Sequence, residues 1–349
     1  MHRLLNVLAW LLIALATLWA AVAIYFDFPF ERLRIPVVIF YVLLVLATIV
    51  FAKPHTRAAL ICVGLFLVVL IWWLAIKPSN DRPWYPDVAQ TAWAEIEGDF
   101  VTLHNFRNCD YRSQSDYTCR WETKRLQLSQ LRGVDVAFVD WGLPNIAHVI
   151  VSFQFGENDY VAASIETRKQ IGQYYSAVRG LFRTYTLIYL FSDERDVIRL
   201  RTNFRHNEEV YLYRTTATPD WSRALFLQYL LRANQLHEHP EWYNALTDNC
   251  TTNIFTEIAR TGRIPSGSSR LDPRIVLSGL ADKMLYDGGN LVGGGPKGGL
   301  SFAELKRSAH INPTARTASY ADFSRAIRVG RHGFEFLSEK SDVSTGNHF

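Results

Sequence analysis

The amino-acid sequence predicts an α+β domain preceded by three transmembrane helices, and two observations lead to that prediction. Three long apolar runs without charged residues occupy the first 80 residues of the 349-residue chain. Short segments rich in β-branched and aromatic residues follow, and helical patterns replace them after about residue 214. Strands followed by helices are typical of α+β domains. We therefore divide the chain into a membrane region (1–80), a globular domain (81–330) and a polar tail (331–349) that we expect to be disordered.

The apolar runs span Leu4–Tyr25, Ile35–Ala52 and Ala58–Ile76. Each is close to the ~20 residues that a helix needs to cross a bilayer. The first run could instead be a cleavable signal peptide, because Ala21-Val22-Ala23 looks like a cleavage site. Its apolar stretch is longer than the usual ~7–15 residues and two further spans follow it, so we predict three spans.

The net charge of +4 lies entirely within the first 80 residues, and the rest of the chain is neutral. A neutral domain offers no electrostatic footprint for phosphate backbones, which argues against a nucleic-acid partner. Basic residues are spread almost evenly over the two sides of the predicted spans, so the positive-inside rule does not decide the orientation.

Two cysteines bear on the orientation. Cys109 and Cys119 bracket the polar loop Asp110–Thr118, and a disulfide closing it would contribute ~2–3 kcal/mol. Such a bond persists only in an oxidising compartment such as the periplasm, so we favour an outward-facing domain. Two unrelated thiols are the alternative, because spacing alone does not establish the geometry of a disulfide. The spacing also lacks the short knuckle of zinc sites, and we expect neither a metal nor another cofactor.

Seven short segments of the globular domain predict strands, and two longer ones predict helices. The strands are Phe100–Asn105, Trp121–Leu128, Val134–Asp140, His148–Phe155, Tyr160–Thr167, Tyr185–Phe191 and Val210–Arg214. The helices are Pro219–His237 and Thr251–Arg260, the second closed by Gly262. Residues 78–98 look like a linker that leads into a short helix. Gly288–Gly299 is glycine-rich but lacks the phosphate-loop pattern, so we predict a flexible loop there.

Cys250 is the first candidate for a reactive side chain. It follows Asp248 and Asn249, which are good N-caps, and so lies in the first turn of the predicted helix. Exposed N–H groups and the helix dipole at that position stabilise a thiolate and lower the pKa of the thiol. A buried structural cysteine is the alternative, because free cysteine packs as a small apolar residue.

His148 is the candidate base for this thiol, because it opens an otherwise apolar strand. The following hairpin turn contains Gly156, and a three-residue loop over 156–158 would place His148 directly opposite Glu166. Opposed residues share one face of a sheet, so Glu166 could orient the imidazole and stabilise its cation. A slip of one residue would put Glu166 on the other face. A thiol, a histidine and a carboxylate in this order predict a cysteine nucleophile with a histidine base.

Three further residues are weaker candidates for contacting a substrate. Trp141 could line a cleft near His148 or be a core tryptophan. Arg168 could bind an anionic head group or form a surface salt bridge. Asn249 adjoins the cysteine.

The motifs around these residues resemble the Lnb N-terminal periplasmic domain family over roughly Phe100–Ile327. The resemblance rests on Asn105-Phe106-Arg107, Trp121-Glu122-Thr123, Leu131-Arg132-Gly133-Val134-Asp135, Ile146-Ala147-His148, Ser164-Ile165-Glu166-Thr167-Arg168, Tyr243-Asn244, Asn249-Cys250-Thr251-Thr252, Asp322-Phe323-Ser324 and Ile327-Arg328. It implies a permuted papain-like (NlpC-type) fold in which the histidine strand precedes the cysteine helix. It also implies a bacterial inner-membrane acyltransferase that acylates the N-terminus of lipoproteins.

Three functions remain open from the sequence. The first is a ping-pong acyltransferase in which Cys250 takes an acyl chain from a membrane phospholipid and passes it to a lipoprotein or another envelope amine. The second is a cysteine hydrolase, a peptidase or amidase, that cleaves cell-envelope peptides. The third is a non-catalytic envelope binding or assembly protein in which Cys250 is merely structural.

Overall fold

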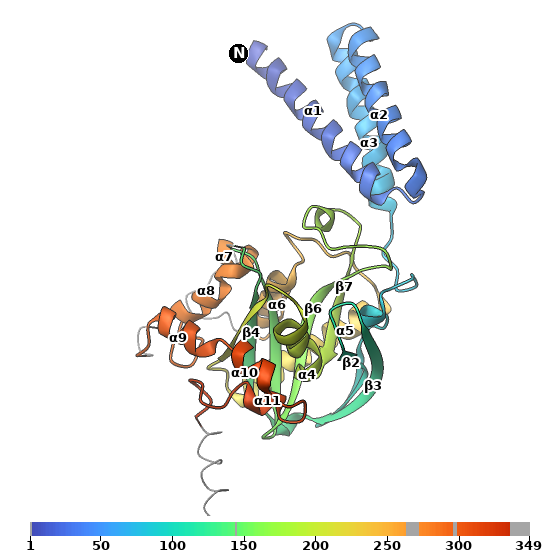
Figure 1. Cartoon of the computed structure of the whole chain (residues 1–349). Helices are drawn as coiled ribbons and strands as arrows, with labels where there is room; N and C mark the ends of the chain where they lie inside the picture. The colour runs from blue at the N-terminus through green and yellow to red at the C-terminus, as the bar shows by residue number, and fades with distance from the viewer. Residues whose placement is uncertain (1, 144, 263–271, 296–298, 336–349) are drawn as a thin grey trace, which may run out of the picture. The chain divides into compact units, whose positions relative to one another are not determined.

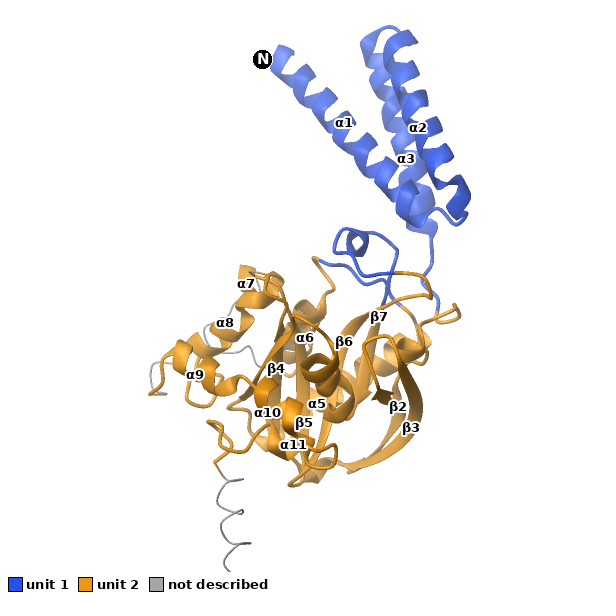
Figure 2. Cartoon of the chain, in the orientation of Figure 1, with its two compact units in different colours: residues 1–79, 174–186, 241–245 blue, residues 80–173, 187–240, 246–349 orange. Residues whose placement is uncertain are grey.

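A computed structural model describes residues 2–143, 145–262, 272–295 and 299–335 of the chain (Figure 1). The chain divides into two compact units, which are coloured separately in Figure 2. Unit 1 contains residues 1–79, 174–186 and 241–245, and unit 2 contains the remaining residues.

Unit 1 is built on three apolar helices, α1 (His2–Asp27), α2 (Glu31–Phe51) and α3 (His55–Ala75). All three are long and apolar enough to cross a membrane, and they coincide with the three predicted runs to within a few residues. They pack through a buried cluster that includes Ile24, Val45 and Val69. Most of their other large apolar side chains are exposed, as expected for helices whose surroundings are lipid.

Unit 2 contains a sheet with eight strands in its described part. They are β1 (Trp93–Glu97), β2 (Phe100–Tyr111), β3 (Tyr117–Gln127), β4 (Leu131–Asp140), β5 (Ala147–Phe155), β6 (Asp159–Arg168), β7 (Thr186–Ser192) and β8 (Glu209–Arg214). Their order across the sheet is β1-β2-β7-β6-β5-β4-β8, and β3 pairs with β2. Seven of these strands overlap the seven predicted ones.

The strand β1 corrects the prediction of a short helix in the linker. The linker has only a 3₁₀ turn at Pro86–Val88, and Trp93–Glu97 pairs antiparallel with β2. Because the Ala94 backbone also exchanges two hydrogen bonds with the Asn234 side chain, at 2.7 and 2.8 Å, the extended conformation is held from both sides.

Helices cover both faces of the sheet, as Figure 1 shows. On one face, Phe153 of β5 packs against Phe226 and Tyr229 of α5 (Pro219–Glu238), and α6 (Cys250–Arg260) lies on the same face. On the other face, a buried cluster joins Ile150 and its neighbours to α4 (Glu194–Arg199), α10 (Asn312–Thr317) and α11 (Phe323–Ala326). Both long predicted helices are therefore present, and both cover one face.

The remaining described helical segments are short. They are a π-helical turn at Leu200–Phe204, 3₁₀ turns at Leu128–Gln130, Arg179–Leu181 and Ser278–Leu280, and the helices α7 (Pro273–Val276), α8 (Ala281–Asp287) and α9 (Phe302–Ala309). Gly262 ends α6 with φ +77°, as predicted for a C-terminal cap.

Two loop predictions need correction where the structure describes them. In the glycine-rich segment, Val292 N–H donates to the Arg214 carbonyl (2.9 Å) and the Asn290 carbonyl accepts from Thr216, so this part is fixed to the end of β8. In the tail, Phe334 is fully buried in the cluster with α10 and α11, so the domain extends beyond residue 330. Residues 296–298 and 336–349 lie outside the described residues.

Candidate active site

The hairpin between β5 and β6 places the candidate base and carboxylate. Phe155 pairs with Asp159 across a three-residue loop in which Gly156 has φ +64°, and the ladder continues to Ile150 opposite Ser164. This is the register that the sequence predicts. His148 and Glu166 each lie two residues further along their strands, so both belong to the face that carries Ile150 and Ser164.

Ser164 connects these two side chains. Its Oγ lies 2.8 Å from His148 Nε2 and donates a hydrogen bond to Glu166 Oε1 at 2.9 Å. His148 Nε2 and Glu166 Oε1 are themselves 3.7 Å apart. A hydroxyl has one proton, and a carboxylate can only accept, so His148 Nε2 must be the donor to Ser164. In the neutral imidazole this assignment leaves Nδ1 unprotonated and able to accept a proton.

Arg201 sets the charge balance around this pair. The π-helical turn presents its guanidinium 3.3 Å from Glu166 Oε1, and the other side of the guanidinium contacts Glu208 at 3.3 Å. Burial would raise the pKa of Glu166, but the Arg201 charge outweighs it and holds that pKa well below its usual range. Burial and then the Arg201 charge lower the pKa of His148 to about 3, against the opposing effect of Glu166. His148 is therefore neutral at pH 7.

Cys250 is the first residue of α6, and local hydrogen bonds fix that helix start. The Asn249 side chain accepts from the N–H groups of Thr251 and Thr252, both at 3.0 Å, and Thr252 Oγ1 in return accepts from the Asn249 N–H (2.9 Å). This is a capping box, with threonine in place of the usual acidic residue. The Asn249 side chain is buried and caps the helix, whereas the sequence alone made it a candidate for a contact with substrate.

The Cys250 thiol lies among backbone N–H groups. The backbone N–H of Val149 donates toward Sγ, the N–H groups of Thr251 and Cys250 lie nearby, and Thr251 Oγ1 is 3.7 Å away. These groups lower the pKa of the thiol, but burial outweighs them and the net effect is to raise it. The prediction of a thiol acidified by its helix start is therefore wrong in sign, because the sequence shows the helix start but not the burial.

Val149 connects the thiol to the strand that carries the imidazole. It follows His148 on β5, and its N–H is the group that reaches Cys250 Sγ. Within the described part of the chain, no hydrogen bond joins Sγ directly to the imidazole. The His148 side chain belongs to the sheet face of Ile150, whereas α6 covers the face of Phe153, so the thiol and the imidazole are connected here only through the backbone of Val149 and His148.

The sequence did not single out Ser164 or Arg201. Ser164 had a usable signal, since it lies two residues before Glu166 and so on the same face. Arg201 had none, because its approach to Glu166 depends on how the turn after α4 packs on the sheet.

Arg168 does not have the exposed position that both sequence-based interpretations require. It is 2% exposed, and its guanidinium donates to Val88 O (2.8 Å), Ala89 O (2.6 Å) and Asn80 Oδ1 (2.7 Å). The same group lies over the Trp84 ring. Arg168 therefore fixes the linker before β1, and it has no free face for a lipid head group.

Trp141 is half-buried and packs against the cluster beneath α10 and α11, which agrees with the interpretation as a core tryptophan.

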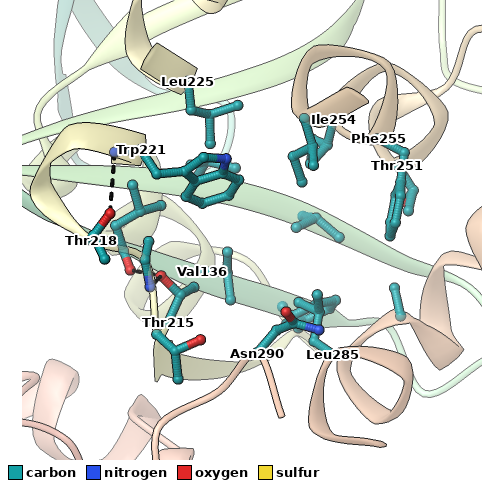
Figure 3. Close-up of a pocket in the computed structure, with 18 residues that line it drawn as sticks. Val136, Thr215, Thr218, Trp221, Leu225, Thr251, Ile254, Phe255, Leu285 and Asn290 are labelled. Atoms are coloured by element: carbon teal, nitrogen blue, oxygen red, sulfur yellow. Dashed lines mark hydrogen bonds between the residues drawn. The ribbon is translucent and has the colours of Figure 1, made fainter. Parts of the chain in front are cut away.

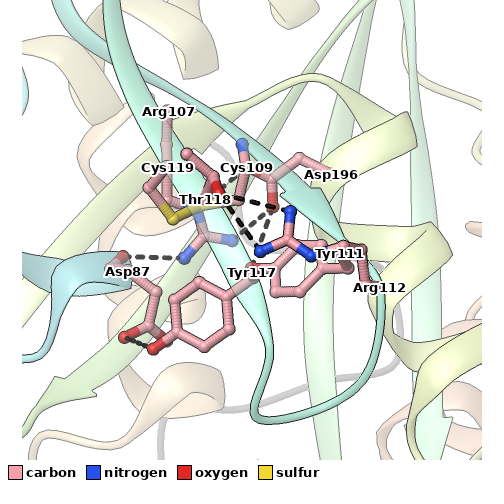
Figure 4. The surroundings of a disulfide bond; sticks show 9 residues. All are labelled: Asp87, Arg107, Cys109, Tyr111, Arg112, Tyr117, Thr118, Cys119 and Asp196. Carbon is pink, nitrogen blue, oxygen red and sulfur yellow. Dashed lines mark hydrogen bonds and ion pairs between the residues drawn. A yellow bond between two sulfur atoms is a disulfide. The ribbon is translucent and has the colours of Figure 1, made fainter.

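Cys109 and Cys119 form a disulfide between directly opposed residues of β2 and β3 (Figure 4). Beside it, the buried Asp196 of α4 accepts from Arg107 Nη2 (2.7 Å) and from the Cys109 backbone N–H (2.8 Å). Arg107 Nη1 donates to the Asp87 carbonyl at 2.9 Å. The disulfide therefore reinforces a hairpin that is also held to α4 and to the linker.

Residues 117–277 match the family model of the Lnb N-terminal periplasmic domain. This range runs from β3 to α7 and includes His148, Ser164, Glu166 and Cys250, whereas the three apolar helices precede it. No curated protein and no solved structure matches the chain.

Proposed function

Because residues 117–277 belong to the Lnb N-terminal periplasmic domain family, we propose that this membrane protein is a cysteine acyltransferase with Cys250 as nucleophile and His148 as base. The observation that carries the proposal is the contact of Cys250 Sγ with the N–H of Val149, next to a histidine that Ser164 links to Glu166. The chain order, His148 then Glu166 then Cys250, also agrees with a permuted papain-like arrangement.

The first half-reaction forms a thioester. The step requires the imidazole to come within reach of Sγ. His148 Nδ1 then takes the Sγ proton, and the thiolate attacks the ester carbonyl of a phospholipid acyl chain. The imidazolium then returns the proton to the departing lysophospholipid alcohol, which leaves the acyl group on Cys250. Glu166 favours the imidazolium through Ser164, while Arg201 opposes it and so keeps the resting imidazole neutral.

The second half-reaction transfers the chain. An amine, which we propose to be the N-terminus of a lipoprotein, attacks the thioester carbonyl and loses a proton to His148. The amide forms, and the Cys250 thiolate leaves and recovers a proton from the imidazolium. Donor and acceptor would both be lipids at the bilayer surface, where three membrane helices would hold the domain. We accordingly propose a multi-pass protein of the bacterial inner membrane whose domain faces the periplasm.

Mass spectrometry of the full chain after incubation with phospholipid vesicles tests this function. We expect a mass increase of one acyl group on the peptide that contains Cys250, removable by hydroxylamine and by an added lipopeptide amine. Cys250→Ser is the matched control and should form no thioester. The absence of a thioester together with cleavage of envelope peptides would favour a hydrolase, and the absence of both activities would favour a non-catalytic binding or assembly protein.

A further inference from the structure

An apolar cavity of about 250 Å³ adjoins the Cys250 site within unit 2 (Figure 3). The side chains of Val136 and Phe138 from β4 and of Val149 and Val151 from β5 form one wall. Figure 3 shows side chains of α5, α6 and α8 around the same space, among them Trp221, Ile254 and Leu285. The lining contains no charged residue, and its polar members are threonines and Asn290.

Two residues belong both to the cavity and to the surroundings of the thiol. Val149 lines the cavity with its side chain, while its N–H donates to Cys250 Sγ. Thr251 lines the cavity, and its Oγ1 lies 3.7 Å from Sγ. Cys250 does not itself line the cavity, but two residues next to its thiol do.

We propose that this cavity binds the hydrocarbon chain of the acyl group that Cys250 carries. The inference rests on the proposed acyltransferase function and adds the place and the chemistry of the chain-binding subsite. An uncharged apolar lining favours a hydrocarbon over a peptide or a sugar, because it offers few hydrogen bonds to replace those with water. Each methylene moved from water into such a lining increases affinity about fourfold.

Chain-length selectivity tests the subsite. Ala217 lines the cavity and is half-buried, so Ala217→Phe reduces the space available to a chain. The measured quantity is the rate of thioester formation from a palmitoyl donor divided by the rate from a butyryl donor. We expect Ala217→Phe to lower this ratio by about tenfold or more, which corresponds to the exclusion of two methylenes from the cavity. Ala259→Phe is the matched control, since Ala259 lies on α6, is half-buried and is not among the lining residues. An unchanged ratio, or the same ratio in both variants, would overturn the proposal.

A second measurement does not depend on catalysis. A phospholipid with a diazirine near the end of one acyl chain is photolysed with the full-length Cys250→Ser protein in vesicles. Cross-links within 134–138, 215–225, 251–258 or 281–290 support the subsite, and cross-links confined to 1–76 contradict it. If wild-type protein forms no thioester but the cross-links map to the cavity, the acyltransferase function fails while the chain-binding site stands.

A different observation, within unit 1, carries an independent inference about residues 174–181, which we call the interfacial segment. Directly after it, Phe182 packs on Trp19 and Phe26 of α1, with ring centroids 6.2 and 5.4 Å apart. The Arg183 guanidinium lies over the Trp73 ring and donates to the carbonyls of Leu74 and Ile76 at the end of α3. The segment is thus fixed to the adjacent ends of two membrane helices.

The interfacial segment exposes apolar and aromatic side chains. Tyr174 is 65% exposed, Val178 54%, Tyr175 43% and Leu181 38%. Arg179 lies over the rings of Tyr174 and Phe26. Amphipathic aromatic rings and arginine are the side chains that favour the headgroup region of a bilayer. We propose that the interfacial segment inserts into the headgroup layer of the membrane that α1 and α3 cross.

Spin-label accessibility tests this second proposal. The nitroxide is attached at Val178→Cys in full-length protein that also carries Cys62→Ala and Cys250→Ser, in phospholipid nanodiscs. Oxygen should increase the relaxation rate of this label more than a water-soluble nickel chelate does. The same label at Ser113→Cys, an exposed position in the β2–β3 hairpin, should show the reverse. If the two labels have the same ratio of accessibilities, the interfacial segment lies in water and the proposal is wrong.

Discussion

The backbone N–H of Val149 donates a hydrogen bond to the Sγ atom of Cys250. This contact joins the thiol to the strand that carries His148, while burial raises the pKa of the thiol and lowers that of the imidazole to about 3. Both shifts favour the uncharged forms. The resting site thus holds a neutral thiol and a neutral imidazole, unlike the thiolate–imidazolium pair of an acidified cysteine.

The pH dependence of alkylation follows from this state. Because the pKa of Cys250 lies above its ordinary value, the thiolate fraction at pH 6–8 is small and rises about tenfold per pH unit. The rate at which iodoacetamide alkylates Cys250, measured by mass spectrometry, should therefore increase with pH over this range and show no plateau at low pH. His148→Ala should leave the slope of this profile unchanged. A plateau extending to about pH 5 that His148→Ala removes would indicate an ion pair and contradict the neutral site.

Ser164→Ala should separate His148 from Glu166. The hydroxyl is the only link that hydrogen-bonds both side chains in the described structure, and alanine fits the buried position. We expect kcat to fall by about tenfold or more, since the imidazolium loses its connection to the carboxylate, with little change in melting temperature. Ser192→Ala is a matched control, because Ser192 is equally buried and its hydroxyl has no hydrogen-bond partner in the described residues. Equal activity of the two variants would remove Ser164 from the site.

Glu166→Gln tests the other end of the same chain of contacts. The amide keeps the size of the side chain but cannot stabilise an imidazolium as a carboxylate does. Arg201 retains Glu208 as a partner, so the fold should persist. Turnover should fall at least as far as in Ser164→Ala. Wild-type kcat in Glu166→Gln would exclude Glu166 from the mechanism.

The sequence could predict the parts of the site that follow from local rules. A glycine-containing loop fixed the register of β5 and β6, and parity then placed Glu166 on the face of His148. The N-cap placed Cys250 at the start of α6. Arg201 and Arg168 could not be predicted in the same way, because their surroundings come from segments far away in the chain. Alternation along β6 puts Arg168 on the face of Glu166, but only the folded linker shows that residues 80–89 bury it.

A topology experiment tests the proposed periplasmic side. Alkaline phosphatase, which needs an oxidising compartment, is fused after Asn80 and, as a control, after Lys53 between α2 and α3. With three spans and a periplasmic domain, the fusion after Asn80 should be active and the fusion after Lys53 inactive. The opposite pattern would place the domain in the cytoplasm.

Removal of the disulfide should lower stability without affecting the site directly. Cys109→Ala with Cys119→Ala opens a loop of about ten residues, so the free energy of unfolding should fall by ~2–3 kcal/mol and the melting temperature by about 5–10 °C. A reductant should lower the melting temperature of the wild type and leave that of the double variant unchanged. If reductant affects both proteins equally, the stabilisation does not come from this bond.

Cys250→Ser should abolish acyl transfer and leave the protein folded and membrane-inserted. Serine is nearly isosteric and is well tolerated at a helix start, but its hydroxyl is far less acidic than a thiol. The thiol of Cys250 already has a raised pKa, so His148, with its pKa of about 3, has even less capacity to activate a hydroxyl.

His148→Ala should cause a similar loss, and the double variant should lose little more, because residues that act as one unit are not additive. A purely structural cysteine predicts the reverse, with activity kept and the melting temperature lowered by the buried hydroxyl. Activity and melting temperature measured on the same Cys250→Ser preparation therefore decide between the two roles. Retained acyl transfer with serine at position 250 would end the assignment of Cys250 as the nucleophile.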